Sequence, residues 1–157
     1  MQKTIEHTTQ LEGKGLHTGC ITTAIFIPEK PNTGIRFRRI DLKNKPYVNA
    51  CVSNVYDTQR RTVLKQNEAL VETVEHVLAA IFVLGINNLT IELNGPEVPI
   101  LDGSSKIFIN KLEAAGIKIQ EEKKKTYTIS NYFKVENKDD NSKIEFFPQK
   151  KLEIEVT

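Results

Sequence analysis

The segment that most constrains this chain is residues 73–84, which has the pattern of a helix with almost no polar side. Its large apolar residues fall on every face of a helix: Val74, Val77, Leu78, Ile81, Phe82, Val83 and Leu84. Gly85 predicts the end of the helix, because a glycine after the last turn readily takes the left-handed conformation. A helix that is apolar all round has to be buried on all sides. It is therefore covered either by a second helix and loops, or by a further layer that this chain lacks.

Before this helix, short runs rich in β-branched residues predict strands separated by turns. The expected strands are residues 4–9, 21–27, 35–40, 47–52 and 62–65. The alternation in Ile35-Arg36-Phe37-Arg38 is typical of a strand with one face on a core and one in water.

After the helix we expect a strand at 88–93 and a second helix at about 105–115. This second helix ends at Gly116, and Ser104 or Ser105 can cap its start. The charged residues 121–125 predict a linker. Beyond the linker, period-2 alternation predicts strands at 126–136, 143–147 and 151–157, with a hairpin turn at 138–141. No helix of their own covers these three strands, which favours an incomplete chain.

Composition excludes several classes of protein. A net charge of +2, from 22 basic and 20 acidic side chains, argues against a nucleic-acid binder, which needs a concentrated basic face. Cys20 and Cys51 cannot form a disulfide framework or a four-cysteine zinc site, and they indicate a reducing compartment.

Residues 1–7 lack the apolar core of a signal peptide, and the longest apolar run, Val77–Ile86, is about half of the ~20 residues that span a bilayer. We expect a cytoplasmic protein with no transmembrane segment.

Glu75 and His76 are the main candidates for chemistry, because they are titratable groups in an otherwise apolar helix. Burying a charge without a partner costs free energy, and one metal ion would compensate both residues. Histidine is a common zinc ligand, and a neighbouring carboxylate can take a proton from the attacking water. The structural alternative is that His76 is a hydrogen-bonded core histidine and Glu75 an exposed helix residue.

The glycine-containing residues 13–19 look at first like a phosphate-binding loop. A strand rather than a helix follows them, so the helix N-terminus that would bind the anion is absent. A β-hairpin turn is therefore favoured, with His17 as a turn or surface histidine.

Two other loops carry polar residues. Residues 57–62 include adjacent guanidinium groups at Arg60 and Arg61, which suit phosphate or carboxylate groups, although a solvated loop is the simpler interpretation. Residues 95–105 predict a rigid connection in which Asp102 or Ser104 caps the second helix.

Five segments, in this order, resemble the UDP-3-O-acyl-N-acetylglucosamine deacetylases, the zinc hydrolases of lipid A synthesis. The segments are Gly13-x-Gly15-Leu16-His17-Thr18-Gly19, Asn32-Thr33-Gly34-Ile35-x-Phe37-Arg38-Arg39-x-Asp41-Leu42, Thr73-Val74-Glu75-His76, Leu84-Gly85-Ile86-Asn87-Asn88 and Glu97-Val98-Pro99-Ile100-Leu101-Asp102-Gly103-Ser104. Each is weak alone, but their order over nearly the whole chain makes the resemblance to the N-terminal half of that enzyme specific.

The resemblance implies an α+β fold of two similar domains, each a β-sheet with two helices packed on one face. The helices of both domains would lie between the two sheets. Residues 1–120 would then be the first domain, 121–125 a linker and 126–157 the opening strands of the second. That second domain would cover the outer side of the first helix.

The resemblance also implies roles for particular residues. His76 would be one ligand of a Zn²⁺ ion, and Glu75 the general base that activates water. The segment beside the metal that contacts the UDP-linked acylated N-acetylglucosamine substrate would be Thr58, Gln59, Arg60 and Arg61. Gln59 departs from the family, which commonly has an apolar residue there, and its two arginine neighbours are unusually basic.

The family takes its other zinc ligands from a His-x-x-x-Asp motif in the second domain, and its general acid is a later histidine. This sequence contains neither, and His7 and His17 match no ligand position. A catalytic zinc needs three protein ligands, so we expect this chain alone to bind zinc weakly and to be inactive.

The implied reaction is hydrolysis of the acetamide, with Glu75 taking the proton of the attacking water. The rival hypothesis is a non-catalytic α+β binding or scaffold module in which Glu75 and His76 are structural.

Overall fold

The computed structural model describes residues 1–156, which form two compact units, Met1–Lys124 and Lys125 onward. The first unit contains two helices and several sheets, so the expected α+β class is confirmed. The assignment of 1–120, 121–125 and 126–157 to domains stays a prediction. Among residues 1–156, neither helix has the length and the apolar character that are needed to cross a membrane.

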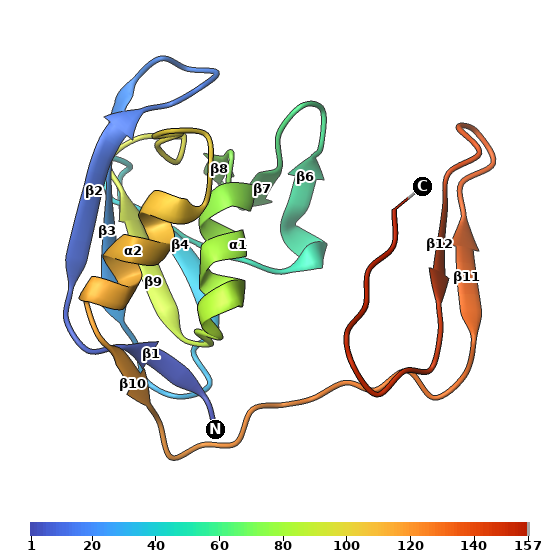
Figure 1. Ribbon diagram of the computed structural model, residues 1–157. Helices are drawn as coiled ribbons and strands as arrows, with labels where there is room; N and C mark the ends of the chain where they lie inside the picture. Colours follow the sequence, from blue (N-terminus) through green and yellow to red (C-terminus); the bar gives the residue numbers. More distant parts are fainter. Residues whose placement is uncertain (157) are drawn as a thin grey trace. The chain divides into compact units, whose positions relative to one another are not determined.

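A five-stranded sheet forms the main layer of the first unit (Figure 1). Its strands, in spatial order, are β2 (Thr9–Lys14), β3 (Ile21–Pro28), β9 (Leu89–Leu93), β4 (Ile35–Arg39) and β5 (Tyr47–Asn49). Only β4 and β9 run parallel, and the other neighbours pair antiparallel. The predicted alternation holds on β4, where Phe37 is buried while Arg36 and Arg38 are half-buried.

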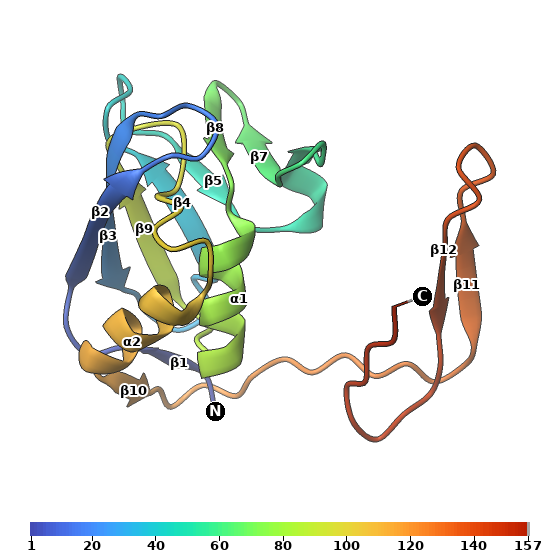
Figure 2. The same cartoon turned by 45° about the horizontal axis from the view of Figure 1, so that its top comes forward.

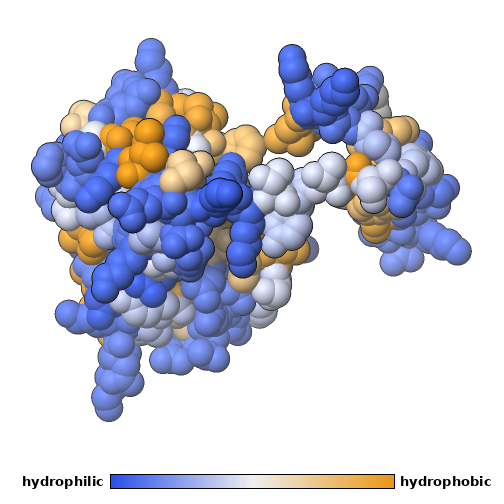
Figure 3. Space-filling model, turned by 90° about the horizontal axis from the view of Figure 1, so that it is seen from below, coloured by the Kyte–Doolittle hydropathy of each residue, from blue (hydrophilic) through white to orange (hydrophobic). Residues whose placement is uncertain are grey.

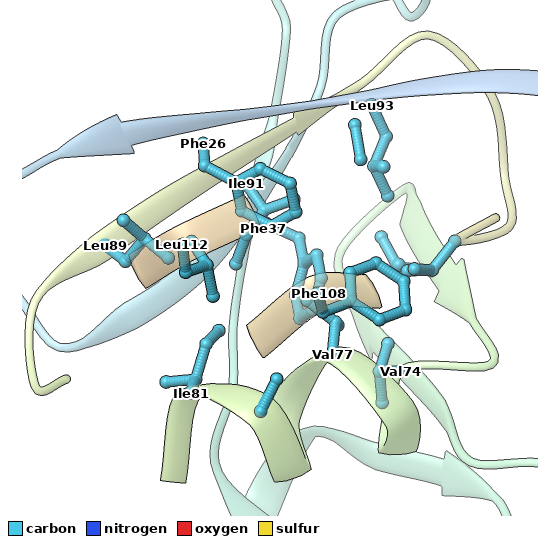
Figure 4. Close-up of a cluster of buried hydrophobic side chains, with 14 of the residues drawn as sticks. Phe26, Phe37, Val74, Val77, Ile81, Leu89, Ile91, Leu93, Phe108 and Leu112 are labelled. Carbon is cyan, nitrogen blue, oxygen red and sulfur yellow. The ribbon is translucent and has the colours of Figure 1, made fainter. Parts of the chain in front are cut away.

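Two helices, α1 (Glu75–Leu84) and α2 (Lys106–Ala114), pack beside each other on one face of this sheet (Figures 1 and 2). Figure 4 shows Val77 of α1 and Phe108 of α2 directed toward the side chains of the sheet. The Phe108 ring meets the Phe26 ring edge-on, with centroids 6.4 Å apart. The expectation of two helices on one face of a sheet is therefore confirmed.

The core covers only one side of α1. Val77, Ala80 and Ile81 are buried, but Phe82 and Val83 are each 68% exposed. Figure 3, which shows the molecule from below, displays apolar patches among the hydrophilic side chains of the first unit. The second helix and the loops do not cover α1 completely, so the alternative, a further layer, stays a prediction.

The ends of both helices follow the sequence signals. Gly85 has φ 68°, and the Ile86 N–H returns to the Ile81 carbonyl at 3.0 Å, which is the expected left-handed stop. Gly116, after α2, has φ 78°. At the start of α2, the Ser104 hydroxyl accepts a hydrogen bond from the Lys106 N–H at 3.1 Å, whereas Ser105 makes no side-chain cap.

Two smaller sheets complete the first unit. β6 (Val55–Asp57), β7 (Val63–Gln66) and β8 (Ala69–Glu72) form one, and β1 (Lys3–Ile5) pairs with β10 (Ile117–Ile119) in the other. The sequence pattern did not predict β6, β8 or β10, because runs of three or four residues are too short to establish a period.

Two predicted strands in this unit are wrong in extent. Residues 4–9 do not form one strand, because β1 and β2 belong to different sheets and the chain turns between Ile5 and Thr9. The strand expected at 47–52 ends at Asn49, and Val52–Asn54 form a 3₁₀ helix (η1). Val52 is 90% exposed, so its β-branched side chain does not indicate a buried strand here.

The second unit contains one hairpin, β11 (Phe133–Glu136) and β12 (Lys143–Phe146). The predicted turn at 138–141 is confirmed, and the strand expected at 126–136 is shortened to β11. The strand expected at 151–157 is wrong for residues 151–156, which have no strand partner despite their alternation. Thr157 lies outside the described residues.

Candidate functional site

The chain turns sharply from β8 into α1 through two buried residues, Thr73 and Val74. Thr73 has φ 57°, a left-handed conformation that is unfavourable for a β-branched residue. Val74 precedes the first residue of α1, Glu75. The position of this turn therefore sets where the first turn of α1, with Glu75 and His76, lies.

Glu75 is half-buried and held at one oxygen. Its Oε2 accepts a hydrogen bond from the Thr62 N–H at 3.1 Å, while Oε1 has no hydrogen bond within residues 1–156. The structural alternative, in which Glu75 is an exposed helix residue, is therefore wrong. A backbone N–H on one oxygen orients the carboxylate and leaves the other oxygen available to take a proton.

His76 is half-buried, and its ring makes no hydrogen bond to the described part of the chain. The alternative of a hydrogen-bonded core histidine therefore does not hold within residues 1–156. An imidazole nitrogen without a protein partner is available as a metal ligand.

The loop between β6 and β7 carries the other predicted site residues. Thr58, Gln59 and Arg60 are exposed, and Arg60 has φ 59°. Arg61 is half-buried, with Nε 2.6 Å from Glu72 Oε2. Only one of the two adjacent guanidinium groups is therefore free of an ion pair within the described chain.

The end of this loop lies against the first turn of α1. The Thr62 N–H binds Glu75, and the Thr62 carbonyl accepts from the Val74 N–H at 3.5 Å. The structure thus brings the end of the 58–61 segment to Glu75, although the two are more than ten residues apart in sequence.

Glu97, which sequence analysis did not single out, is the most elaborately bonded carboxylate of the first unit. It is fully buried, and it accepts hydrogen bonds from the His17 N–H at 3.0 Å, the Thr18 N–H at 2.8 Å, the Thr18 hydroxyl at 2.7 Å and the Thr73 hydroxyl at 2.8 Å. Burial alone would raise the pKa of Glu97, but these hydrogen bonds outweigh it and hold the pKa below the ordinary value.

The loop of residues 15–20 joins β2 to β3, so the predicted hairpin connection is confirmed. Its backbone N–H groups do bind an anion, as a phosphate loop would, but that anion is the protein's own Glu97 carboxylate. Gly15 is the residue in the sequence that could have indicated this contact, because a Cβ at its position would collide with Glu97 Oε2. The His17 residue is exposed.

The structural role predicted for residues 95–105 is confirmed where this segment leads into α2. Asp102 accepts hydrogen bonds from the N–H and the hydroxyl of Ser104, which in turn accepts from Lys106. The Ser104 N–H and hydroxyl lower the pKa of the exposed Asp102 carboxylate. Asp102 therefore acts through Ser104 rather than directly on the helix.

No group of three or more His, Cys, Asp or Glu side chains that could hold a metal ion occurs within residues 1–156. Cys20 and Cys51 are free and exposed. Of the residues predicted for a metal site, His76 is therefore the one that provides an imidazole as a ligand, and Glu75 lies next to it in sequence.

A sheet with two helices on one face, and a glutamate–histidine pair at the start of the first helix, define this chain as an α+β protein with a candidate catalytic pair. The sequence profile of the LpxC family, UDP-3-O-acyl N-acetylglycosamine deacetylase, matches residues 2–157. The chain belongs to this family.

Similar proteins bear related names. The chain is 42% identical over 155 residues to the UDP-3-O-acyl-N-acetylglucosamine deacetylase of Brucella melitensis, covering 99% of this chain and 54% of that protein. It is 40% identical to a bifunctional enzyme LpxC/FabZ of Bacteroides thetaiotaomicron and 37% identical to that of Porphyromonas gingivalis, in each case over 99% of this chain and 34% of the relative. The chain thus spans from about a third to about half the length of these relatives.

Proposed function

We propose that this chain is the part of a zinc-dependent deacetylase that carries its general base and one zinc ligand. The substrate would be a UDP-linked, acylated N-acetylglucosamine, from which the enzyme removes the acetyl group as acetate. The observation that carries the proposal is the pair at the start of α1: Glu75 is fixed through one oxygen, and the neighbouring His76 ring has no hydrogen bond within residues 1–156.

His76 fits a role as a metal ligand. A half-buried imidazole with free nitrogens in an apolar helix is costly to desolvate unless something binds it. Zinc, when bound, would lower the pKa of a water molecule and polarise the acetamide carbonyl. His76 would be one of its ligands, and residues outside the described chain would supply the others, because a catalytic zinc takes three protein ligands.

Glu75 fits the role of general base. Its Oε2 is occupied by the Thr62 N–H, so Oε1 is the oxygen that would take the proton from the attacking water. The same backbone contact keeps the carboxylate from rotating away, which favours proton transfer in a fixed geometry.

The 58–61 segment fits a role in binding the substrate. Arg60 is exposed and lies in the loop that ends at Glu75, so it would meet an anionic group such as a diphosphate. Arg61 would contribute less, because its guanidinium already pairs with Glu72. Thr58 and Gln59 would contact neutral parts of the substrate.

The uncovered side of α1 fits a chain that works as part of a longer protein. Phe82 and Val83 would be covered by a second domain of the same enzyme, which would also provide the remaining zinc ligands and the general acid. We propose that the 157-residue chain alone is inactive, that the complete enzyme acts in lipid A synthesis, and that it is located in the cytoplasm.

The experiment that tests this proposal uses the full-length protein with single substitutions. His76→Ala should remove stoichiometric zinc and deacetylation while the fold is retained, and Glu75→Gln should abolish deacetylation with zinc still bound. The exposed residues His7 and Glu113 provide matched controls, His7→Ala and Glu113→Gln, which should leave both measurements unchanged.

The opposite result identifies the rival function. If His76→Ala lowers the thermal midpoint of unfolding but leaves zinc content and activity as in the wild type, the pair is structural. The chain would then be part of a non-catalytic binding or scaffold module.

A further inference from the structure

We propose that Glu97 is a positioning residue for the candidate site, fixing the turn from which α1 starts and hence the placement of Glu75 and His76. The inference rests on the proposed function of that pair. Glu97 does not touch either residue; it acts through Thr73, two residues before Glu75.

The first step of the argument is that Thr73 needs an external hold. Its φ of 57° is unfavourable for a β-branched residue, so the chain keeps this conformation only where its surroundings impose it. The Thr73 hydroxyl donates to Glu97 Oε1 at 2.8 Å, in a site where Thr73 is 2% exposed. This charge-assisted bond is therefore a direct restraint on the turn.

The second step is that Glu97 is itself held from two sides. Its backbone forms a parallel bridge with Glu72, and the Val98 N–H binds the Glu72 carbonyl at 3.1 Å. On the other side, the N–H groups of His17 and Thr18 fix both carboxylate oxygens. A carboxylate clamped in this way transmits the position of the sheet to Thr73.

The third step is that an apolar residue could not do the same. An apolar side chain would avoid the cost of burying a carboxylate, but it would contact Thr73 without a hydrogen bond. Hydrogen bonds, in contrast, are directional, and the bond from the Thr73 hydroxyl to Glu97 restrains the rotation of Thr73 as well as its location. The Gly15 position, where a Cβ would collide with Glu97, shows that the loop is fitted to this side chain.

The test compares Glu97→Gln with Glu113→Gln in the full-length protein. The amide keeps the volume of Glu97 but turns one acceptor oxygen into a donor that faces N–H and O–H groups. Groups that orient metal ligands and catalytic residues typically contribute factors of about 10 to 100. We expect about tenfold weaker zinc binding in a chelator competition and about tenfold lower kcat, with KM within about twofold. Glu113→Gln should change neither.

A second pair of variants isolates the bond to Thr73. Thr73→Val keeps the shape and removes the hydroxyl, and Thr73→Ser keeps the hydroxyl. We expect Thr73→Val to reproduce the losses of Glu97→Gln and Thr73→Ser to retain wild-type zinc affinity and kcat. This pair also decides the question if Glu97→Gln does not fold.

A third measurement does not depend on activity. The amide proton of Thr62 donates to Glu75, so its hydrogen-exchange rate reports whether Glu75 keeps its place. We expect faster exchange at Thr62 in Glu97→Gln and Thr73→Val than in Glu113→Gln and Thr73→Ser.

The proposal is overturned if Glu97→Gln and Thr73→Val lower only the thermal midpoint and leave zinc affinity, kcat and Thr62 exchange unchanged. Glu97 would then only stabilise the fold. A wild-type protein that neither binds zinc nor deacetylates the substrate would instead refute the proposed function, and it would be recognised in the wild-type and Glu113→Gln samples alone.

Discussion

Two neighbouring residues of α1 provide a sharp test of how this helix is covered. Ile81 is 3% exposed and Phe82 is 68% exposed. In the 157-residue chain, Ile81→Ala should therefore lower the free energy of unfolding by about 2–5 kcal/mol, the usual range for a buried aliphatic side chain. Phe82→Ala should lower it by at most ~1 kcal/mol, because little packing is lost and alanine favours the helix.

The same substitution should cost more where a further layer covers the helix. A phenylalanine side chain buries on the order of 200 Å² when fully covered. Covering the 68% of Phe82 that is exposed here would therefore add about 3 kcal/mol at ~25 cal/mol per Å². We expect Phe82→Ala to lower the stability of the full-length protein by that additional amount.

Urea denaturation followed by circular dichroism measures both effects, and an unchanged dependence on urea concentration shows that the change is one of stability. A cost of Phe82→Ala equal to that of Ile81→Ala in the 157-residue chain would show that Phe82 is already covered. An effect of at most ~1 kcal/mol in the full-length protein would refute the further layer.

Three further predictions concern Glu97 and the candidate metal site. Gly15→Ala should destabilise the chain by more than about 2 kcal/mol, measured by urea denaturation, because its Cβ meets the clamped Glu97 carboxylate. The pKa of Glu97 in the folded protein is lowered from 4.5, so the stability that its carboxylate contributes is complete above pH 4.5 and is lost as the pH falls through the folded pKa. Glu97→Gln should therefore weaken the loss of stability on acidification. An unchanged dependence of stability on pH would contradict this prediction. Zinc titrated into the 157-residue chain by calorimetry should bind weakly, and submicromolar, stoichiometric binding that requires His76 would contradict the prediction.

The helices and the longer strands could be predicted from sequence because their signals are local. Gly85 and Gly116 stop both helices in the left-handed conformation that the sequence indicates. The alternation around Phe37 correctly places one face of β4 in the core. Each of these features depends on residues that are close in sequence.

Features that depend on distant partners could not be predicted in this way. Glu97 receives its hydrogen bonds from residues 24 and about 80 positions away, so no local pattern marks it. The alternation at 151–157 predicts a strand, but a strand needs a neighbour, and residues 151–156 have none. The ion pair of Arg61 with Glu72 likewise became visible only in the folded chain.

The pairing of β1 with β10 has a consequence for how the first unit can be combined with other polypeptide. Lys3 lies opposite Ile119, and the Gln2 N–H binds the carbonyl of Glu122, so the points where the chain enters and leaves the unit are adjacent. Buried Asn88 ties these two points together through Gln2 and Gln120. A unit whose two ends are adjacent tolerates fusion, tandem duplication or insertion into a host protein, because the flanking polypeptide is joined to it at one place on its surface and its core is not disturbed.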